Sequence, residues 1–133
     1  MNIQALVQEF HETFGHPVAL TPGLISKERA AFRVSLIEEE LQELKDAIEA
    51  GDLVEIGDAL GDLEVVINGT GLEYGIRLPE VVREIHASNM SKLGEDGEPI
   101  YREDGKILKG ANFWHPRIDV VLEGQGWRGE KLR

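Results

Sequence analysis

Two long stretches of helical apolar spacing, separated by the dipeptide Gly51-Asp52, constrain the fold of this chain more than any other feature. Ser26 can cap the first helix, because its hydroxyl can accept a hydrogen bond from a first-turn amide. This helix should end near residue 50. Gly51 can end that helix, and Asp52 can cap a second helix that stops near residue 74, before Gly75. A connection this short makes the two helices antiparallel neighbours. The sequence therefore predicts a helical hairpin over residues 26–74.

Further elements are expected on both sides of this hairpin. Apolar spacing, a proline that suits a first helical turn, and a turn-forming tripeptide predict them from the same rules. They are helices over residues 2–14, 79–93 and 117–123, and a β-hairpin that pairs residues 99–102 with 106–109 around Glu103-Asp104-Gly105. We therefore expect an all-α protein: a four-helix bundle core with a small C-terminal β-hairpin and a tail.

Length and composition narrow the class of protein. A chain of 133 residues suits one domain, so we expect a single unit over residues 1–133, with an extension over about 94–133. The absence of cysteine excludes disulfides and thiolate metal sites. No apolar stretch is long enough to span a membrane, and the first residues lack a secretory-signal pattern, so we expect no membrane partner and a cytoplasmic location. The formal net charge of −11 argues against nucleic acid as a partner. The last ten residues, Gly-rich and charged, are expected to be mobile or to pack on a partner subunit.

Some acidic residues of the first long helix lie on the wrong side for ordinary solvation. At about 100° per residue, Glu38 and Glu49 project toward solvent. Glu40 and Glu43 instead project about 60° apart into a sector that is otherwise apolar, and Glu39 lies at the edge of that sector. Carboxylates among core-type residues need a partner.

The second long helix repeats this pattern. Glu55, Asp58 and Asp62 project within about 60° of one another among small and apolar residues. Two like charges about 5 Å apart repel by on the order of 3 kcal/mol at an effective dielectric constant near 20. Folding alone would not favour such a cluster, whereas a hard divalent cation such as Mg²⁺ prefers oxygen ligands of this kind. A single Glu on a helix is more often an ordinary solvated side chain, but six acidic residues on two adjacent helices favour a metal site.

Four segments of the chain, spread over roughly residues 5–120, resemble the MazG-like all-α nucleoside triphosphate pyrophosphohydrolases. Residues 36–43, Leu-Ile-Glu-Glu-Glu-Leu-Gln-Glu, resemble the ExxE segment of that superfamily, and Glu55-Ile56-Gly57-Asp58 resembles its ExxD segment, continued over 58–63. Residues 86–92 and 104–110 resemble a bacterial branch that includes dUTP-hydrolysing members.

This resemblance implies a helical bundle that forms a homodimer or a higher homo-oligomer. It also implies Mg²⁺-dependent hydrolysis of a nucleoside triphosphate between the α and β phosphates, with Mn²⁺ as a possible substitute. By position, Glu39, Glu40, Glu43 and the pair Asp58/Asp62 would bind the metal. An alignment on ExxD pairs Glu55 with Asp58, whereas an alignment on the downstream glycines makes Asp62 the second ligand, and both remain open.

Roles in catalysis and substrate binding follow as hypotheses. Glu39 or Glu40 would accept the proton of the attacking water, as a carboxylate not fully committed to metal. Lysine offers a compact positive charge to phosphate oxygens. The candidates for substrate binding are therefore Lys92, Lys106 and Lys109, with Asn89 as a hydrogen-bonding partner, although Lys106 by itself is better explained as an ordinary surface cation.

Three functions remain in competition. The first is a nucleotide-pool (house-cleaning) pyrophosphohydrolase, acting on dUTP or another nucleoside triphosphate. The second is a phosphoribosyl-ATP pyrophosphohydrolase, whose substrate carries a second phosphate group and so calls for a further basic cluster. The third is a non-catalytic helical dimerisation module, which would lack tight metal binding. An aromatic turn over 113–115 is better explained as an anchor of the tail than as a platform for a base.

Overall fold

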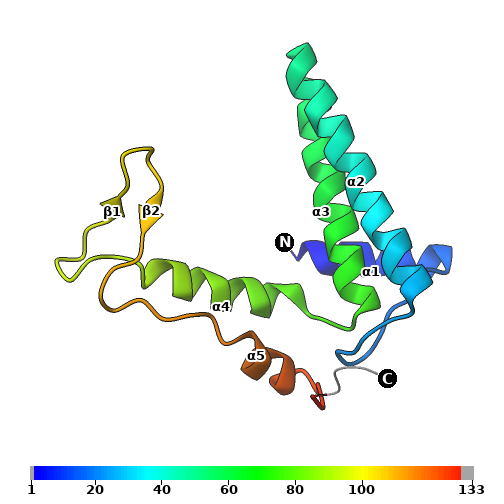
Figure 1. The fold of residues 1–133 in the computed structure, drawn as a ribbon. Coiled ribbons are helices and arrows are strands. Elements are labelled where there is room, and N and C mark those ends of the chain that lie inside the picture. Colours follow the sequence, from blue (N-terminus) through cyan, green and yellow to red (C-terminus); the bar gives the residue numbers. More distant parts are fainter. Residues whose placement is uncertain (1, 130–133) are drawn as a thin grey trace.

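The computed structural model describes residues 2–129 and contains helices with one small β-hairpin (Figure 1). This confirms the predicted all-α class and the hairpin near the C-terminus. In chain order the elements are α1 (Ile3–Phe14), α2 (Lys27–Ala50), α3 (Leu53–Glu73), α4 (Leu78–Met90), β1 (Ile100–Tyr101), β2 (Ile107–Leu108) and α5 (Ile118–Gly124).

The two long helices α2 and α3 form an antiparallel hairpin, as the Gly51-Asp52 connection predicted (Figure 1). The side chain of Ser26 accepts a hydrogen bond from the amide of Arg29 at 3.1 Å, and this begins α2. Gly51 ends α2 in the left-handed region at φ 67°, which glycine adopts without steric cost. Asp52 then accepts from the amide of Glu55 at 3.2 Å and begins α3. The chain therefore reverses direction over two residues at the tip of the hairpin.

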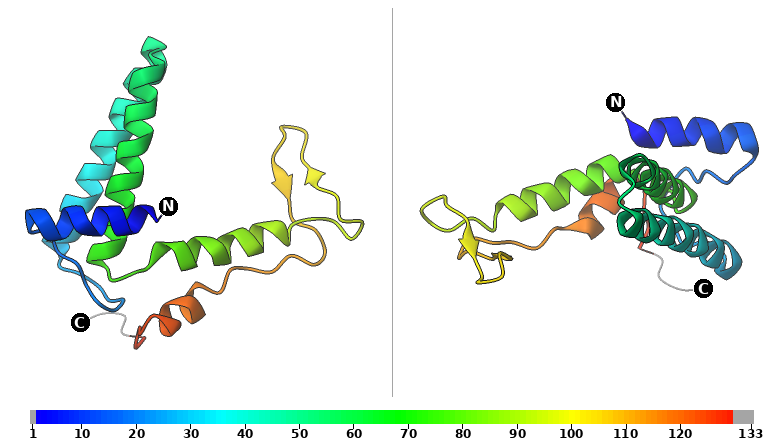
Figure 2. Two further views of the ribbon diagram at one scale, coloured as in Figure 1. Left: turned by 180° about the vertical axis from the view of Figure 1, so that it is seen from behind. Right: turned by 90° about the horizontal axis from the view of Figure 1, so that it is seen from above.

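Helix α1 crosses α3 near the open end of the hairpin, which we call its root (Figure 2). The crossing buries Val7 and His11 of α1. It depends on Gly69 of α3, because a Cβ atom there would lie only 2.6 Å from the His11 Nε2 atom. The glycine thus allows the two backbones to approach closely.

The corner between α3 and α4 is held by two glutamine side chains. Gln4 of α1 donates to the carbonyl of Ile76 at 2.9 Å and accepts from the amide of Leu78 at 3.0 Å. Gln125, just after α5, accepts from the amide of Arg77 at 2.9 Å and donates to the carbonyl of the same residue at 3.0 Å. Both glutamines are buried, so the start of α4 is tied to the first and the last helix of the chain.

Beyond this corner α4 runs away from the α2–α3 hairpin, and α5 packs beside it (Figures 1 and 2). The β-hairpin extends the same arm, with Ile100 opposite Leu108 and Tyr101 opposite Ile107. Its strands are shorter than the predicted ranges. The single chain therefore has two arms, a helical hairpin crossed by α1 and an arm formed by α4, α5 and the β-hairpin.

The apolar stripe of α2 is largely uncovered within one chain. Val34, Leu41 and Ile48 expose 52%, 42% and 59% of their surface. The total accessible surface is 9464 Å², whereas a compact monomer of this mass would expose about 7,000 Å². No helix of residues 2–129 is long and apolar enough to cross a membrane.

The expectation for the last ten residues divides at residue 129. Gln125 is buried against its own chain, so the first part of this tail packs on the α3–α4 corner. Residues 130–133 lie outside the described part of the chain.

Candidate metal centre

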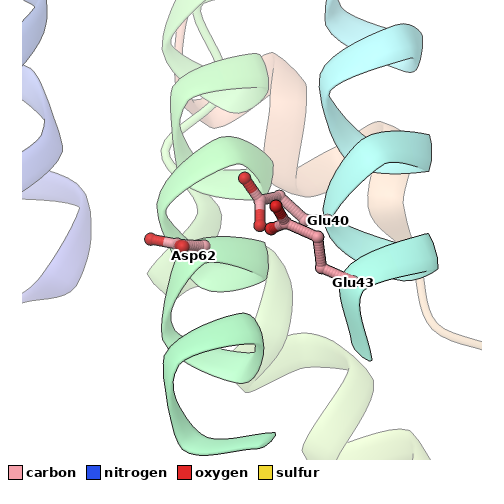
Figure 3. Close-up of side chains that lie close together, drawn as sticks. All are labelled: Glu40, Glu43 and Asp62. Carbon is pink, nitrogen blue, oxygen red and sulfur yellow. The ribbon is translucent and has the colours of Figure 1, made fainter. Parts of the chain in front are cut away.

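Three carboxylates meet midway along the hairpin. Glu40 and Glu43 of α2 and Asp62 of α3 each offer one oxygen atom, and these oxygens lie within 4.8 Å of one another (Figure 3). Glu40 and Glu43 are about one helical turn apart, so they share the face of α2 that lies against α3. Ala47 and Ala59 are buried nearer the tip, and their small side chains let the two helices approach.

The cluster strongly disfavours full ionisation. A hydrogen bond with Glu43, burial, and the charges of Asp62, Glu43 and Asp58 together raise the pKa of Glu40 to about 7. Burial, assisted by the charges of Asp58 and Glu43, also raises the pKa of Asp62. The Oε2 atom of Glu40 is buried and has no hydrogen-bond partner among the described residues. A buried acceptor without a donor is costly in a folded protein.

A divalent cation fits this set of donors. The ligands are all oxygen atoms, which Mg²⁺ and Mn²⁺ accept, and they come from two helices that the chain holds in apposition. A cation would offset the mutual repulsion of the carboxylates, and it would give the unpaired oxygen of Glu40 an electrostatic partner.

The other predicted ligands lie at different distances from this cluster. Asp58 is near enough for its charge to raise the pKa values of both Glu40 and Asp62. Glu55 lines an open groove of about 290 Å³ toward the tip, together with Glu43 and Asp58. Glu39 is exposed and is not one of the three residues that converge. In this geometry Asp62, rather than Glu55, faces Glu40 and Glu43.

The predicted substrate-binding residues lie on the other arm of the chain. Asn89 is exposed near the end of α4, and the half-buried Lys92 follows that helix, where its carbonyl accepts from the amide of Gly110 at 2.8 Å. Lys106 is exposed in the β-hairpin. The ammonium group of Lys109 lies 4.8 Å from the centre of the Phe113 ring. One chain therefore does not bring these residues to its own carboxylates, because α4 runs away from the hairpin (Figure 1).

The aromatic turn is attached to the end of α4. The hydroxyl of Ser88, a buried residue, donates to the carbonyl of Trp114 at 2.8 Å, and the amide of Trp114 donates to the hydroxyl of Ser91 at 3.1 Å. These contacts are those of an anchor for the returning chain.

The sequence interpretation missed an ion cluster at the root of the hairpin, which we call the arginine clamp (Arg29, Arg33 and Glu73). Arg29 donates to Glu73 from Nε at 2.9 Å and from Nη2 at 2.6 Å. Arg33 donates to Glu73 at 3.2 Å, to the hydroxyl of Thr70 at 3.1 Å and to the carbonyl of Val66 at 2.7 Å. The side chains of Arg33 and Glu73 expose only 4% and 1% of their surface.

A signal for the clamp was present in the sequence. Arg33 precedes Glu40 by about two helical turns and so lies on the same face of the helix. A cation placed in a buried sector needs a buried anion. Glu73, at the end of the next antiparallel helix, was the residue in reach.

Comparison with known proteins agrees with this geometry. The family model of phosphoribosyl-ATP pyrophosphohydrolase matches residues 7–89, which include α2, α3 and the carboxylate cluster. The chain belongs to the phosphoribosyl-ATP pyrophosphohydrolase family. Members of this family share the helical fold of the MazG-like superfamily, so the predicted resemblance is confirmed at that level. The branch that includes dUTP-hydrolysing members is not distinguished by this match.

A solved structure supports the same assignment. The protein of Exiguobacterium sp. 255-15, described as a candidate NTP pyrophosphohydrolase, is 28% identical in sequence. The match covers 94% of each chain with a TM-score of 0.50. The matched family model and the matched solved structure are thus both of pyrophosphohydrolases.

A viral relative adds a sequence match. An uncharacterized protein of Acanthamoeba polyphaga mimivirus is 35% identical over 112 residues. The match covers 81% of this chain but only 42% of the viral protein, so the chain corresponds to less than half of that relative.

Proposed function

We propose that this protein hydrolyses a nucleoside triphosphate between the α and β phosphates, releasing a nucleoside monophosphate and pyrophosphate. The observation that carries the proposal is the convergence of Glu40, Glu43 and Asp62 within 4.8 Å, on a fold whose family cleaves nucleotide phosphoanhydrides. In this proposal the three carboxylates hold Mg²⁺ or Mn²⁺, with Asp58 as a further ligand and Glu55 beside the groove.

The chain's own residues would divide the work as follows. A bound Mg²⁺ supplies positive charge for the polyphosphate and lowers the pKa of a water molecule. Glu43 and Asp62 would hold the cation from opposite helices. Glu40 would accept the proton of the attacking water, because its Oε2 atom has no hydrogen-bond partner among the described residues. Glu39 is the weaker candidate for this role, since its side chain is exposed outside the cluster.

The reaction products test the proposal directly. The protein is incubated with Mg²⁺ and a panel of dUTP, dCTP, dATP, dGTP and the ribonucleotides, and pyrophosphate and phosphate are measured separately. We expect pyrophosphate and the monophosphate in equal amounts from at least one substrate. Release of phosphate alone would overturn cleavage between the α and β phosphates.

The preferred substrate is a finer proposal. The segments 86–92 and 104–110 resemble a branch with dUTP-hydrolysing members, so we propose a deoxynucleotide such as dUTP and a role in nucleotide-pool sanitation. The family match favours phosphoribosyl-ATP as the second candidate. Including that compound in the panel separates the two, because the enzymes differ in which substrate gives the highest kcat/KM.

We also propose that the working molecule is a homodimer or a higher homo-oligomer. The accessible surface of the single chain exceeds that of a compact protein of its mass by about 2,500 Å², an amount that a substantial interface would cover. The exposed apolar residues include Val34, Leu41 and Ile48 on α2 and Leu60 and Ile67 on α3. Size-exclusion chromatography with light scattering measures the mass, and a monomer at micromolar concentration would contradict the proposal.

An oligomer would also complete the substrate site. Asn89 and Lys92 lie on the α4 arm, away from the carboxylates of the same chain. If they bind the phosphates, they reach a carboxylate cluster on a second copy. Each site would then draw its metal ligands from one chain and its cations from another.

A further inference from the structure

The carboxylate cluster lies between two structural features that align α2 with α3. At the tip, Gly51 and Asp52 reverse the chain within two residues. At the root, the arginine clamp joins the first turns of α2 to the last turns of α3. Glu40 follows Arg33 by about two turns on α2, and Asp62 precedes Thr70 by about two turns on α3. The alignment of α2 against α3 that pairs Arg33 with Thr70 therefore also places Glu40 opposite Asp62.

The carboxylate cluster depends on the register of α2 against α3. A slip of one helical turn would displace the facing side chains by about 5.4 Å. That displacement exceeds the 4.8 Å that encloses the three carboxylate oxygens. A slipped or splayed hairpin would therefore separate Asp62 from Glu40 and Glu43, even if both helices remained intact.

Few apolar side chains of α2 are buried against α3. The buried residues of α2 are Arg33 and Ala47, and only Ala47 is apolar. Near the cluster, Gly57 and Gly61 of α3 have no atom within 4 Å of where a Cβ would lie. The carboxylates themselves repel one another, because their oxygen atoms lie within 4.8 Å of one another. Within one chain, the arginine clamp at the root supplies attraction that opposes this repulsion.

We propose that Arg33, together with Arg29 and Glu73, is a positioning element that holds α2 and α3 in the register required for divalent-cation binding at Glu40, Glu43 and Asp62. Arg33 suits this role because its three donor nitrogens bond to three successive points along α3, at Val66, Thr70 and Glu73. A planar guanidinium with three bonds restricts sliding in a way that a single point charge does not. The inference rests on the metal-binding part of the proposed function.

The test measures cation binding without nucleotide. Mn²⁺ is titrated into the wild-type protein and into Arg33→Lys, which keeps the charge but loses the three-pronged geometry. We expect the Mn²⁺ dissociation constant to rise about tenfold. The matched control is Gln125→Ala, which removes a buried hydrogen-bonded side chain on the other arm and should leave Mn²⁺ affinity unchanged.

A distance measurement separates register from general stability. The chain has no cysteine, so spin labels can be attached at Lys45→Cys on α2 and Glu64→Cys on α3 without competing thiols. The labelled protein is diluted into an excess of unlabelled protein, so that each measured pair lies within one chain. We expect Arg33→Lys to broaden or shift the distance distribution, and saturating Mn²⁺ to restore it in part.

Arg29 provides a second variant in case the buried Arg33 cannot be replaced. Its side chain is 36% exposed, and Arg29→Gln removes the two-pronged bond to Glu73 while leaving the contacts of Arg33 in place. We expect Mn²⁺ binding to weaken by about threefold, with partial rescue in Arg29→Lys. Unchanged Mn²⁺ affinity and an unchanged distance distribution in folded Arg33→Lys or Arg29→Gln would overturn the positioning role. If wild-type protein itself binds no Mn²⁺, the proposed metal centre fails first.

Discussion

At the scale of single residues, Glu40 combines three properties that its neighbours share only in part. It lies in the carboxylate cluster, one of its oxygens is buried without a partner, and its pKa is raised to about 7. Glu43 and Asp62 share the cluster, but Glu43 is exposed and Asp62 has no buried oxygen that lacks a partner among the described residues. Glu40 is therefore the position at which charge, metal and proton transfer would meet.

Replacing Glu40 with Gln tests whether this residue both binds the metal and accepts the proton. The amide has nearly the same shape, but it can neither accept the proton of water nor bind a cation as strongly. We expect kcat to fall by about 100-fold or more, with an unchanged circular dichroism spectrum. Glu38→Gln is the matched control, because Glu38 is exposed on the same helix. Near wild-type turnover in Glu40→Gln would remove this residue from the chemistry.

The raised pKa of Glu40 predicts how cation binding depends on pH. The pKa of Glu40 is about 7 in the metal-free folded protein and 4.5 in the unfolded chain. Between pH 4.5 and pH 7, the folded protein therefore keeps a proton on Glu40 that the unfolded chain has lost. The contribution of Glu40 to the free energy of unfolding is thus full below pH 4.5 and is lost as the pH rises through 7. A cation must displace this proton below pH 7, so Mn²⁺ affinity should rise about tenfold per pH unit and level off above pH 7.

Calorimetry in buffers with different ionisation enthalpies measures the displaced proton. About one proton should be released per site below pH 7 and none well above it. Glu40→Gln should flatten the profile. Proton release that does not change between pH 6 and pH 8 would contradict the link between Glu40 and the cation.

At the scale of helices, local signals in the sequence predicted where elements begin and end. Ser26, Gly51 and Asp52 act through their own backbone neighbourhoods, so the caps they were expected to form are present. The face of α2 that carries Glu40 and Glu43 was also predicted, because helical period determines which residues share a face. The role of each acidic residue at the metal was predicted as well, and it stays a prediction.

Contacts between distant segments were not predictable in the same way. Periodicity does not reveal which neighbour covers a face. It indicated that Arg33 needs a buried anion, but it gave no pairing for Gln125 with Arg77. Nor did it show that α4 would run away from α2 and α3 instead of packing along them (Figure 2). These features depend on tertiary geometry that a single sequence does not record.

The crossing of α1 over α3 yields a prediction for Gly69→Ala. The added methyl would lie 2.5 Å from Nη2 of Arg33 and 2.6 Å from Nε2 of His11, so the crossing or the clamp must shift. Alanine favours helix by itself, but we expect overpacking to dominate and the free energy of unfolding to fall by about 1–3 kcal/mol. Thermal or urea unfolding measures it. Gly61→Ala on the same helix is the control within one chain, because its added methyl meets no atom within 4 Å, and stabilisation by Gly69→Ala would contradict the close approach.

At the scale of the whole molecule, the two arms of one chain carry different parts of the proposed site. Glu40 lies on the helical hairpin, and Lys92 follows α4 on the other arm. In a dimer whose sites combine both arms, each site takes Glu40 from one chain and Lys92 from the other. Glu40→Gln and Lys92→Ala therefore remove side chains that different chains contribute to one site. A mixed dimer would then contain one site with both defects and one with neither.

Mixing the two inactive variants is therefore informative. After co-refolding or co-expression, we expect about a quarter of wild-type activity, since half of the dimers are mixed and each has one intact site. Each variant alone should remain inactive. The absence of recovery in a mixture shown to exchange subunits would mean that Glu40 and Lys92 of one chain serve the same site. Activity of Lys92→Ala by itself would mean that Lys92 serves none.

The two hydrogen bonds between Gln125 and Arg77 have a consequence for chain entropy. They join the beginning and the end of the second arm, so α4, the β-hairpin and α5 form one closed loop of 48 residues in sequence separation. The entropic cost of closing a loop grows only slowly with length, by about 0.6 kcal/mol for each doubling. Extra residues inserted at the exposed turn around Gly105 should therefore hardly affect closure. After a cut at the same turn, non-covalent contacts alone would hold the two halves together: the Gln125–Arg77 bonds, the bonds of Trp114 to Ser88 and Ser91, and the packing of α5 against α4.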